Sequence, residues 1–314
     1  MAGGTELPCG RPGATTQAMS TDKPRRPGHA GQSSRQGRNF GRPKPAFDRG
    51  TKRAPPSWTR QGGAGEDGDA DGVVLLWGMH PVEAALANPA RVISKLYLTE
   101  NAENKLKAAL EARGAVAERV HPRDLDKRLG ADTVHQGVLL ETEPLPELPM
   151  NALARTAEGR PLIVLDQVTD PHNVGAVLRS AAVFGAAGVV MTRRNSPPLA
   201  GVLAKSASGA LEMVPVARVQ NLARSLEDLK VAGCTVIGLD GEGTETLDAI
   251  AWPAQPVFVL GAEGKGLRQL TKETCSMVCR IATAGQLASL NVSNAAAVAL
   301  HLAHMRRRGV IHGR

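Results

Sequence analysis

The chain has 314 residues and a net charge of +8, a length sufficient for about two domains with additional segments. No apolar run is long enough to span a bilayer, and the first residues lack the basic and apolar regions of a secretory signal. These features exclude membrane-spanning and secreted classes, so we expect a cytoplasmic protein.

The four cysteines, Cys9, Cys234, Cys275 and Cys279, do not form a metal-binding pattern. Cys275 and Cys279 share one face if their segment is helical, but no second pair of Cys or His residues lies at metal-ligand spacing. We therefore expect free thiols in a reducing compartment and no metal site.

The first 72 residues are rich in Gly, Pro, Arg, Ser and Gln. Residues 1–60 hold 12 Lys and Arg against 3 Asp and Glu, so the basic charge belongs to this leader. Its few aliphatic residues predict disorder over residues 1–72. Its charge suits sequence-independent binding to phosphates, with Phe40, Phe47 and Trp58 able to stack on bases. A solubilising tail without a partner explains the composition equally well.

Residues 73–142 alternate strands with helices, which predicts a small α/β domain. We expect strands over 73–78, 95–98, 116–120 and 138–142, and helices over 80–88, 101–113 and 122–129. Three prolines in residues 143–149 then predict an extended linker and a domain boundary.

Residues 150–314 predict a second α/β domain. The continuous apolar run over 161–165 is typical of a strand buried on both faces of a parallel sheet. Further strands are expected over 188–192, 235–240, 256–260 and 277–281, and helices over 151–157, 174–184, 222–232 and 291–308. Residues 206–210 read as a turn. Asn173 is a candidate helix N-cap, as are Asn291, Ser293 and Asn294.

Three polar loops follow predicted strands: residues 166–173, 261–266 and 289–293. The carboxyl ends of strands are where open α/β sheets bind ligands, so the loops predict a binding site. The glycine-rich loop 261–266 fails the P-loop pattern, because Lys265 is followed by Gly266 and position 259 is Val. It also fails the spacing of a dinucleotide-binding fingerprint, which disfavours a nucleotide-dependent oxidoreductase. A structural turn is the alternative for this loop.

Arg179 lies in an otherwise apolar helix, so we expect it to pair with an anion, since an unpaired buried charge is costly. Its partner is either Glu263 or a substrate phosphate or hydroxyl. His172 is a candidate general base, although a single loop histidine is weak support.

The three loops carry a family resemblance. Asp-x-x-x-Asp-Pro-x-Asn-x-Gly-x-x-x-Arg-Ser-Ala at 166–181, Leu-Gly-Ala-Glu-Gly-x-Gly-Leu at 260–267 and Ser-Leu-Asn-Val-Ser at 289–293 occur in order. They resemble the three motifs of the SpoU-type (TrmH-like) RNA ribose 2′-O-methyltransferases of the SPOUT superfamily. Residues 73–142 resemble the small RNA-substrate-binding domain of the branch that methylates a guanosine of large-subunit ribosomal RNA.

The resemblance implies an α/β domain with a deep trefoil knot, an exception to the usual rule against knots. It implies a homodimer with the site at the subunit interface and S-adenosylmethionine bound in the knot. By matching position, Leu260, Gly261, Gly264, Gly266, Ile281 and Leu290 would contact this cofactor. Arg179 would activate the ribose 2′-hydroxyl, with Asn173, Glu263, Asn291 and Ser293 as the other polar motif positions.

The sequence thus predicts an S-adenosylmethionine-dependent ribosomal RNA ribose 2′-O-methyltransferase. A transfer RNA methyltransferase is the nearest alternative, but the shortest of those enzymes lack a small domain. A catalytically inactive RNA-binding assembly factor predicts loss of Arg179, Asn173 or Glu263, and all three are present. Position 294 is Asn, where several relatives carry Val. This departure lies beside the motif, so we expect it to alter the local helix cap without removing the chemistry.

Overall fold

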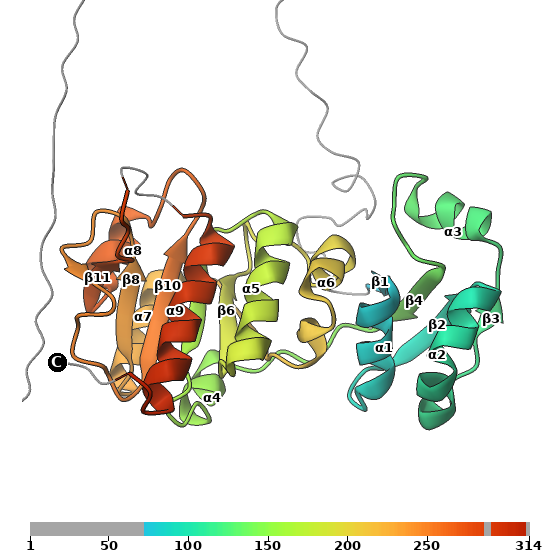
Figure 1. Ribbon diagram of the computed structural model, residues 1–314, viewed down its shortest axis with the longest axis horizontal. Coiled ribbons are helices and arrows are strands. Elements are labelled where there is room, and N and C mark those ends of the chain that lie inside the picture. The colour runs from blue at the N-terminus through green and yellow to red at the C-terminus, as the bar shows by residue number, and fades with distance from the viewer. Residues whose placement is uncertain (1–71, 286–289, 312–314) are drawn as a thin grey trace, which may run out of the picture. The chain divides into compact units, whose positions relative to one another are not determined.

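The structure is a computed structural model that describes residues 72–285 and 290–311 (Figure 1). Apart from Gly72, the leader expected over residues 1–72 lies outside these ranges, and so does Ser289 of the third motif.

A four-stranded sheet organises the first described region, in the order β1-β4-β2-β3. Its elements are β1 (Val74–Trp77), α1 (Met79–Ala87), β2 (Ile93–Leu98), α2 (Glu100–Arg113), β3 (Glu118–Arg119), α3 (Pro122–Leu129) and β4 (Val138–Thr142). Side chains alternate between the two faces, so Leu96 and Leu98 pack under α1 and α2 while Tyr97 packs against α3. All predicted elements of this region are confirmed, with β3 shorter than expected because Val116 is 91% exposed and packs on no core.

The second region contains a sheet of seven strands in the order β7-β6-β5-β10-β8-β11-β9, and every pair is parallel. The strands are β5 (Leu162–Asp166), β6 (Gly188–Thr192), β7 (Val216–Val219), β8 (Thr235–Leu239), β9 (Glu245–Thr246), β10 (Pro256–Gly261) and β11 (Met277–Arg280). The apolar runs of β5 and β6 are buried along their whole length, as predicted for a parallel sheet. The α/β fold class is confirmed.

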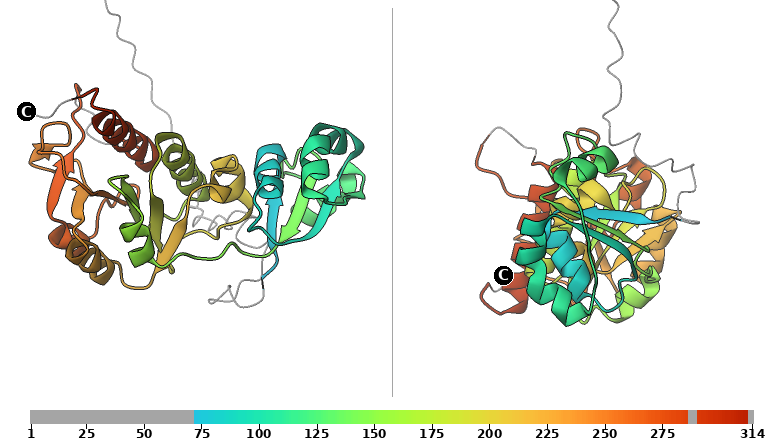
Figure 2. Two further views of the ribbon diagram at one scale, coloured as in Figure 1. Left: turned by 90° about the horizontal axis from the view of Figure 1, so that it is seen from below. Right: turned by 90° about the vertical axis from the view of Figure 1, so that its right-hand side faces the viewer.

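Helices cover both faces of this sheet, which gives two hydrophobic cores. Figures 1 and 2 show α5 and α9 side by side on one face, where they pack on β-strand residues such as Ile163 and Phe258. The opposite core joins Leu162, Val164 and Val257 to α4 and α7. The helices are α4 (Met150–Arg155), α5 (Pro171–Phe184), α6 (Gly201–Ala207), the 3₁₀ helix η2 (Ala210–Glu212), α7 (Leu222–Val231), α8 (Gln269–Thr274) and α9 (Val292–Arg307).

Two local predictions were wrong for identifiable reasons. Asn173 is not the N-cap of α5, because the helix begins earlier, at Pro171. A proline tolerates the first helical turn, and the side chain of Asp170 caps the helix by accepting from the backbone N–H of His172 at 2.9 Å. Ser206 and Ala207 were expected in a turn but end α6, and the turn follows at Ser208 and Gly209, both with left-handed φ.

Close packing of α6 on α5 explains the glycine in the first motif. A Cβ at Gly175 would lie 2.5 Å from the Cβ of Ser206 and 2.6 Å from the carbonyl oxygen of Leu203. The absence of a side chain at Gly175 therefore lets the two helix backbones approach.

The predicted strand over 277–281 also ends one residue early, which leaves Ile281 in the following loop. Cys275 caps α8 while Cys279 lies on β11, so the two thiols do not share a helix face.

A buried ion pair joins the four-stranded region to the seven-stranded region. The guanidinium of Arg91, 2% exposed, donates from Nη2 to Glu212 Oε1 at 2.6 Å and from Nε to Oε2 at 3.2 Å. Its Nη1 donates to the carbonyl oxygen of Glu143 at 2.9 Å, and Asn88 Nδ2 donates to Glu212 at 2.8 Å. The charges are thus paired and hydrogen-bonded, as burial requires.

We predict that Glu212→Ala lowers the free energy of unfolding by about 3–5 kcal/mol, because it leaves the Arg91 charge buried without its partner. Urea unfolding followed by circular dichroism measures this loss. The control is Glu103→Ala, which removes an exposed partner of Arg119 and costs about 1 kcal/mol or less. Equal losses in the two variants would contradict the role of the buried pair.

Candidate active site at the carboxyl ends of β5 and β10

The order of the parallel strands reverses between β5 and β10. From β5 the chain continues through β6 to β7 on one side, while β10 pairs with β8 on the other. Such a switch point opens a crevice outside the carboxyl ends of the strands, where α/β sheets bind ligands. Loop 166–170 leaves β5 here, and loop 261–266 leaves β10 beside it.

The glycine-rich loop folds back on itself immediately after β10. Ala262 and Gly266 form an isolated β-bridge, and the N–H of Gly266 donates to the carbonyl of Ala262 at 2.9 Å. A Cβ at Gly261 would lie 2.1 Å from the carbonyl carbon of Gly266, so no side chain fits there. Gly264 and Gly266 have φ of +75° and +64°. The loop is therefore a tight turn, and this turn presents Glu263.

The Glu263 carboxylate connects all three polar loops. Its Oε1 accepts from Asn173 Nδ2 at 2.9 Å and from Asn291 Nδ2 at 2.5 Å. Asn291 Nδ2 also donates to Asn173 Oδ1 at 3.0 Å, and Asn173 Nδ2 donates to Asp170 Oδ2 at 3.2 Å. Asn173 is buried, whereas Glu263 and Asn291 reach the surface. Residues predicted from three separate motifs thus form one hydrogen-bonded network.

Asn291 is both the predicted cap of α9 and a member of this network. Its Oδ1 accepts from the backbone N–H of Ser293 at 2.8 Å and from Ser293 Oγ at 2.5 Å. Because the oxygen is used by the helix, the amide nitrogen faces Asn173 and Glu263. Helix capping therefore sets the orientation of the amide at the candidate site.

Arg179 differs from its expected environment. The predicted burial is wrong, because Arg179 lies on the exposed side of α5 while Val177 and Leu178 face the core. Within residues 72–285 and 290–311 it makes no hydrogen bond or ion pair, and Glu263 binds the two asparagines instead. A free guanidinium on the surface is available for an anion from outside the chain.

The positions expected to contact a cofactor lie in two segments, the end of β10 with its glycine loop and the segment between β11 and α9. Leu260 is buried at the end of β10, whereas Ile281 is partly exposed and Leu290 is 44% exposed. These two apolar side chains flank the loop after β11 and the start of α9. His172, the tentative base, is exposed; its backbone carbonyl accepts from Ser206 Oγ at 3.0 Å.

Two carboxylates anchor the segment that follows the glycine loop: the buried Asp166, which is the first position of the first motif, and the partly buried Asp240, which the sequence did not single out. Asp166 ends β5 with its side chain inaccessible to solvent, and accepts from Arg268 Nε at 2.7 Å and from Arg268 N at 3.3 Å. Asp240 follows β8 and forms an ion pair with Lys272 at 2.8 Å, and its Oδ2 would lie 3.2 Å from a Cβ on Gly266. For both residues, the pattern in the sequence that points to this role is a carboxylate at or directly after the end of an apolar strand.

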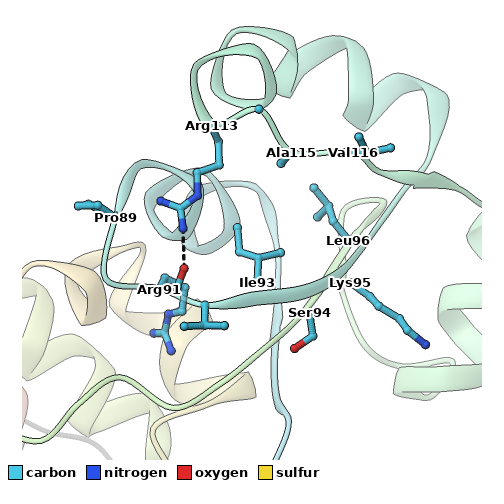
Figure 3. A pocket seen from close by; sticks show the side chains of 11 residues that line it. Pro89, Arg91, Ile93, Ser94, Lys95, Leu96, Arg113, Ala115 and Val116 are labelled. Atoms are coloured by element: carbon cyan, nitrogen blue, oxygen red, sulfur yellow. Dashed lines mark hydrogen bonds between the residues drawn. The ribbon is translucent and has the colours of Figure 1, made fainter.

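A cavity of about 460 Å³ lies in the four-stranded region (Figure 3). Its arginines are already engaged: Arg113 Nη2 donates to the Arg91 carbonyl at 2.6 Å, as Figure 3 shows, and Arg91 is paired with Glu212. These contacts serve packing rather than ligand binding.

No group of three or more His, Cys, Asp or Glu in the described ranges could hold a metal ion. In the same ranges no helix is both long and apolar enough to cross a membrane.

Fold and site define an α/β protein with a candidate ligand site at a sheet switch point, and comparisons with known proteins identify its family. The SpoU rRNA Methylase family matches residues 160–301, and the RNA 2′-O ribose methyltransferase substrate-binding family matches residues 75–148. The chain belongs to the SpoU family of RNA ribose 2′-O-methyltransferases, as the motifs predicted.

Two relatives match this chain over nearly their whole length. The chain is 39% identical over 234 residues to the 23S rRNA (guanosine-2′-O-)-methyltransferase RlmB of Pseudomonas aeruginosa, covering 72% of this chain and 93% of that protein. It is 40% identical over 242 residues to RlmB of Ralstonia nicotianae, covering 76% and 97%.

A solved structure shares the fold. The SpoU methyltransferase AviRb from Streptomyces viridochromogenes, in complex with AdoMet, superposes with a TM-score of 0.64 at 24% identity. The match covers 76% of this chain and 91% of AviRb.

The ion pair of Asp240 makes the stability of the loop dependent on pH. Burial acts to raise the pKa of Asp240, but hydrogen bonds from Lys272 and the backbone of Glu242 outweigh it, so this pKa lies below its ordinary 3.8. The hydrogen bond with Asp240 raises the pKa of Lys272. Stabilisation by ionised Asp240 is therefore complete above about pH 4 and is lost as pH falls through the folded pKa.

We predict that Asp240→Asn lowers the free energy of unfolding at pH 7 by about 1–3 kcal/mol, because a charged hydrogen-bond acceptor is lost. The difference from the unsubstituted protein shrinks as pH falls below about 4, where Asp240 itself becomes protonated. Urea unfolding between pH 7 and pH 3 measures both effects, with Asp132→Asn, an exposed carboxylate, as the control. A difference that stays constant over this range would contradict the assignment.

Proposed function

We propose that this protein uses S-adenosylmethionine to methylate the ribose 2′-hydroxyl of a guanosine in 23S ribosomal RNA. The hydrogen-bonded network of Asn173, Glu263 and Asn291 at the β5–β10 switch point carries this proposal. It occurs in a chain whose relatives, matched over more than nine-tenths of their length, are named for this reaction. Such a substrate places the enzyme in the cytoplasm.

The residues expected to hold the cofactor suit its chemistry. Gly261 and Gly266 allow the tight turn, and Gly264 leaves its backbone open to close approach, since no atom lies within 4 Å of a Cβ position there. Leu290 and Ile281 offer apolar surface for a purine ring. S-adenosylmethionine, when bound, supplies a methyl group on a sulfonium. The transfer forms a bond from the ribose 2′-oxygen to this methyl carbon, breaks the carbon–sulfur bond and releases the hydroxyl proton.

In this mechanism the protein chiefly positions the hydroxyl and stabilises its developing negative charge. The network of Asn173, Glu263 and Asn291 fixes the loops around the ribose, and Ser293 supports Asn291. A guanidinium offers hydrogen-bond donors and no acceptor, so Arg179 is not assigned as the group that accepts the proton. Instead it binds a phosphate or the ribose, and its charge favours loss of the hydroxyl proton.

The exposed face of α5 and α9 supports the proposal of a homodimer. Arg179 and Val183 are four residues apart and so share one face of α5, where Val183 is 67% exposed. Val298 on the adjacent α9 is 43% exposed. Six residues at about 100° per residue place Asn173 and Arg179 about 120° apart around the helix, so they lie on different faces. We infer that a second copy covers this face and that Arg179 serves the site of its partner subunit.

The trefoil knot and the domain plan belong to the same proposal. Strand β11 lies between β8 and β9, and β10 lies between β5 and β8, so late strands enter beside earlier ones. This order is compatible with a C-terminal segment threaded through a preceding loop. The proposed plan is a leader over 1–72, an RNA-binding domain over 73–142, a linker over 143–149 and a methyltransferase domain over 150–314.

Mapping of ribose methylation tests the substrate. Deletion of the gene is expected to remove one 2′-O-methyl mark from a guanosine of 23S ribosomal RNA, and the unsubstituted gene restores it. Transfer RNA methylation is measured in the same strains. An intact set of 23S marks, or loss of a transfer RNA mark instead, would overturn the substrate assignment.

We predict that Arg179→Ala lowers kcat/KM for methyl transfer to ribosomal RNA by about 10²–10³-fold, because charge stabilisation is lost in the transition state. Binding of S-adenosylmethionine, measured by calorimetry, stays within about twofold, since no cofactor position is altered. Arg155→Ala, a variant of an exposed arginine on α4, is expected to leave both quantities unchanged. Full activity in Arg179→Ala would refute the role of the arginine.

Mixed dimers test whether Arg179 acts across the interface. Subunits with Arg179→Ala are combined with subunits carrying Glu263→Ala, each inactive alone. Action across the interface leaves one complete site per mixed dimer, so activity returns. If activity does not return in dimers shown by mass spectrometry to be mixed, Arg179 acts within its own subunit.

A further inference from the structure

A second cavity, of about 400 Å³, lies at the carboxyl ends of β5, β6 and β7. Its polar lining comes from the loops after these strands and from the start of α8: Gln167, Thr192, Arg194, Asn195, Gln220 and Arg268. The volume falls in the range of small-molecule sites, and the position follows the rule for open α/β sheets.

The cavity is electropositive. Arg194 is exposed, and its guanidinium has no hydrogen bond or ion pair with any residue in the described ranges. Arg268 binds the buried Asp166 through Nε, which fixes the side chain and leaves its two Nη groups without a partner in that part of the chain. The residues that line the cavity include no carboxylate. Two forked cations therefore face the same space, one of them held rigidly.

The backbone around the cavity holds two amide side chains in uncommon conformations. Gln167 and Asn195 have φ of 58° and 59°, in the left-handed region that favours glycine. Neither side-chain amide makes a hydrogen bond within residues 72–285 and 290–311, nor does that of Gln220. Strained residues with free amides are frequent at binding sites, because bound groups supply the missing partners.

The cavity also shares its loops with the candidate active site. Gln167 belongs to the loop that leads to Asn173, and Arg268 follows directly on the glycine loop that carries Glu263. Asn173 and Glu263 of these two segments belong to the hydrogen-bonded network, whereas Gln167 and Arg268 of the same segments line the cavity. An RNA chain with a ribose at the network therefore lies next to segments that also line the cavity.

We propose that this cavity binds the RNA backbone next to the methylated nucleotide. Arg194 and Arg268 contact a phosphate, and the amides of Gln167 and Asn195 contact the adjoining nucleotide. The inference rests on the proposed function, since it takes RNA as the substrate. It assigns the cavity to substrate positioning, separate from the cofactor and from the reacting hydroxyl.

Binding of the full-length protein to a 23S RNA fragment that contains the mapped guanosine tests the proposal. Fluorescence anisotropy gives Kd at several KCl concentrations. Arg194→Ala is expected to raise Kd about three- to tenfold at low salt, as loss of one charged contact predicts. The slope of log Kd against log salt falls by about 0.7, the value for one phosphate of a single strand. Arg194→Lys keeps the positive charge, so log Kd is expected to depend on log salt nearly as steeply as in the unsubstituted protein.

Further measurements separate positioning from catalysis and from misfolding. Arg194→Ala raises KM for RNA while kcat and the Kd of S-adenosylmethionine stay unchanged, and its melting temperature matches that of the unsubstituted protein. Asn195→Gly keeps the left-handed backbone but removes the amide, and also raises KM for RNA. Arg155→Ala is the matched control, because Arg155 is exposed on α4, before β5, and lines no part of the cavity.

The outcomes distinguish failure of the proposed role of the cavity from failure of the proposed function of the protein. If the unsubstituted protein methylates the fragment but Arg194→Ala keeps its Kd and its salt slope, the cavity does not bind RNA. The same conclusion follows if Arg155→Ala weakens binding equally, since the effect is then general charge loss. If the unsubstituted protein neither binds nor methylates ribosomal RNA, the proposed function itself fails.

Discussion

The carboxylate of Glu263 accepts hydrogen bonds from Asn173 and Asn291, which lie 90 and 28 residues away in the chain. This contact joins three loops that leave different elements of the fold. In each asparagine the amide nitrogen donates hydrogen bonds and the amide oxygen accepts at least one. Asn291 caps α9 with its oxygen and joins the network with its nitrogen, so helix formation and site assembly are coupled.

The segment that follows the loop presenting Glu263 is anchored by two ion pairs. Asp166 fixes Arg268 at the end of the loop, and Asp240 pairs with Lys272 beside Gly266. The close approach of Gly261 to Gly266 permits no side chain. These contacts preorganise the loop before any substrate binds, which is what a reaction that depends on positioning requires.

The fold was predictable where a local pattern decides the structure. Apolar runs gave β5 and β10, a glycine in the left-handed conformation ended α2 at Gly114, and Asn291 was recognised as a cap. Strand β7 was missed because it contains Arg218, and α8 is a short helix of polar residues. The start of α5 was misplaced because a cap depends on which side chain reaches the backbone.

The site was predictable in its members but not in its contacts. The motifs identified Asn173, Glu263 and Asn291, yet no sequence pattern shows that one oxygen serves both amides. Arg179 was expected to be buried because its neighbours are apolar, whereas the side chain faces outward. The cavity beside Arg194 depends on strand order, since β5, β6 and β7 bring distant loops to one edge.

A double-mutant cycle tests most directly whether the three loops act as one unit. Asn173→Ala, Asn291→Ala and the double variant are compared by kcat/KM for methyl transfer, with circular dichroism to verify folding. If Glu263 needs both donors, the double variant is no more than about threefold less active than the worse single variant. Losses that multiply, as they do for independent sites, would contradict the claim that this network forms the active site.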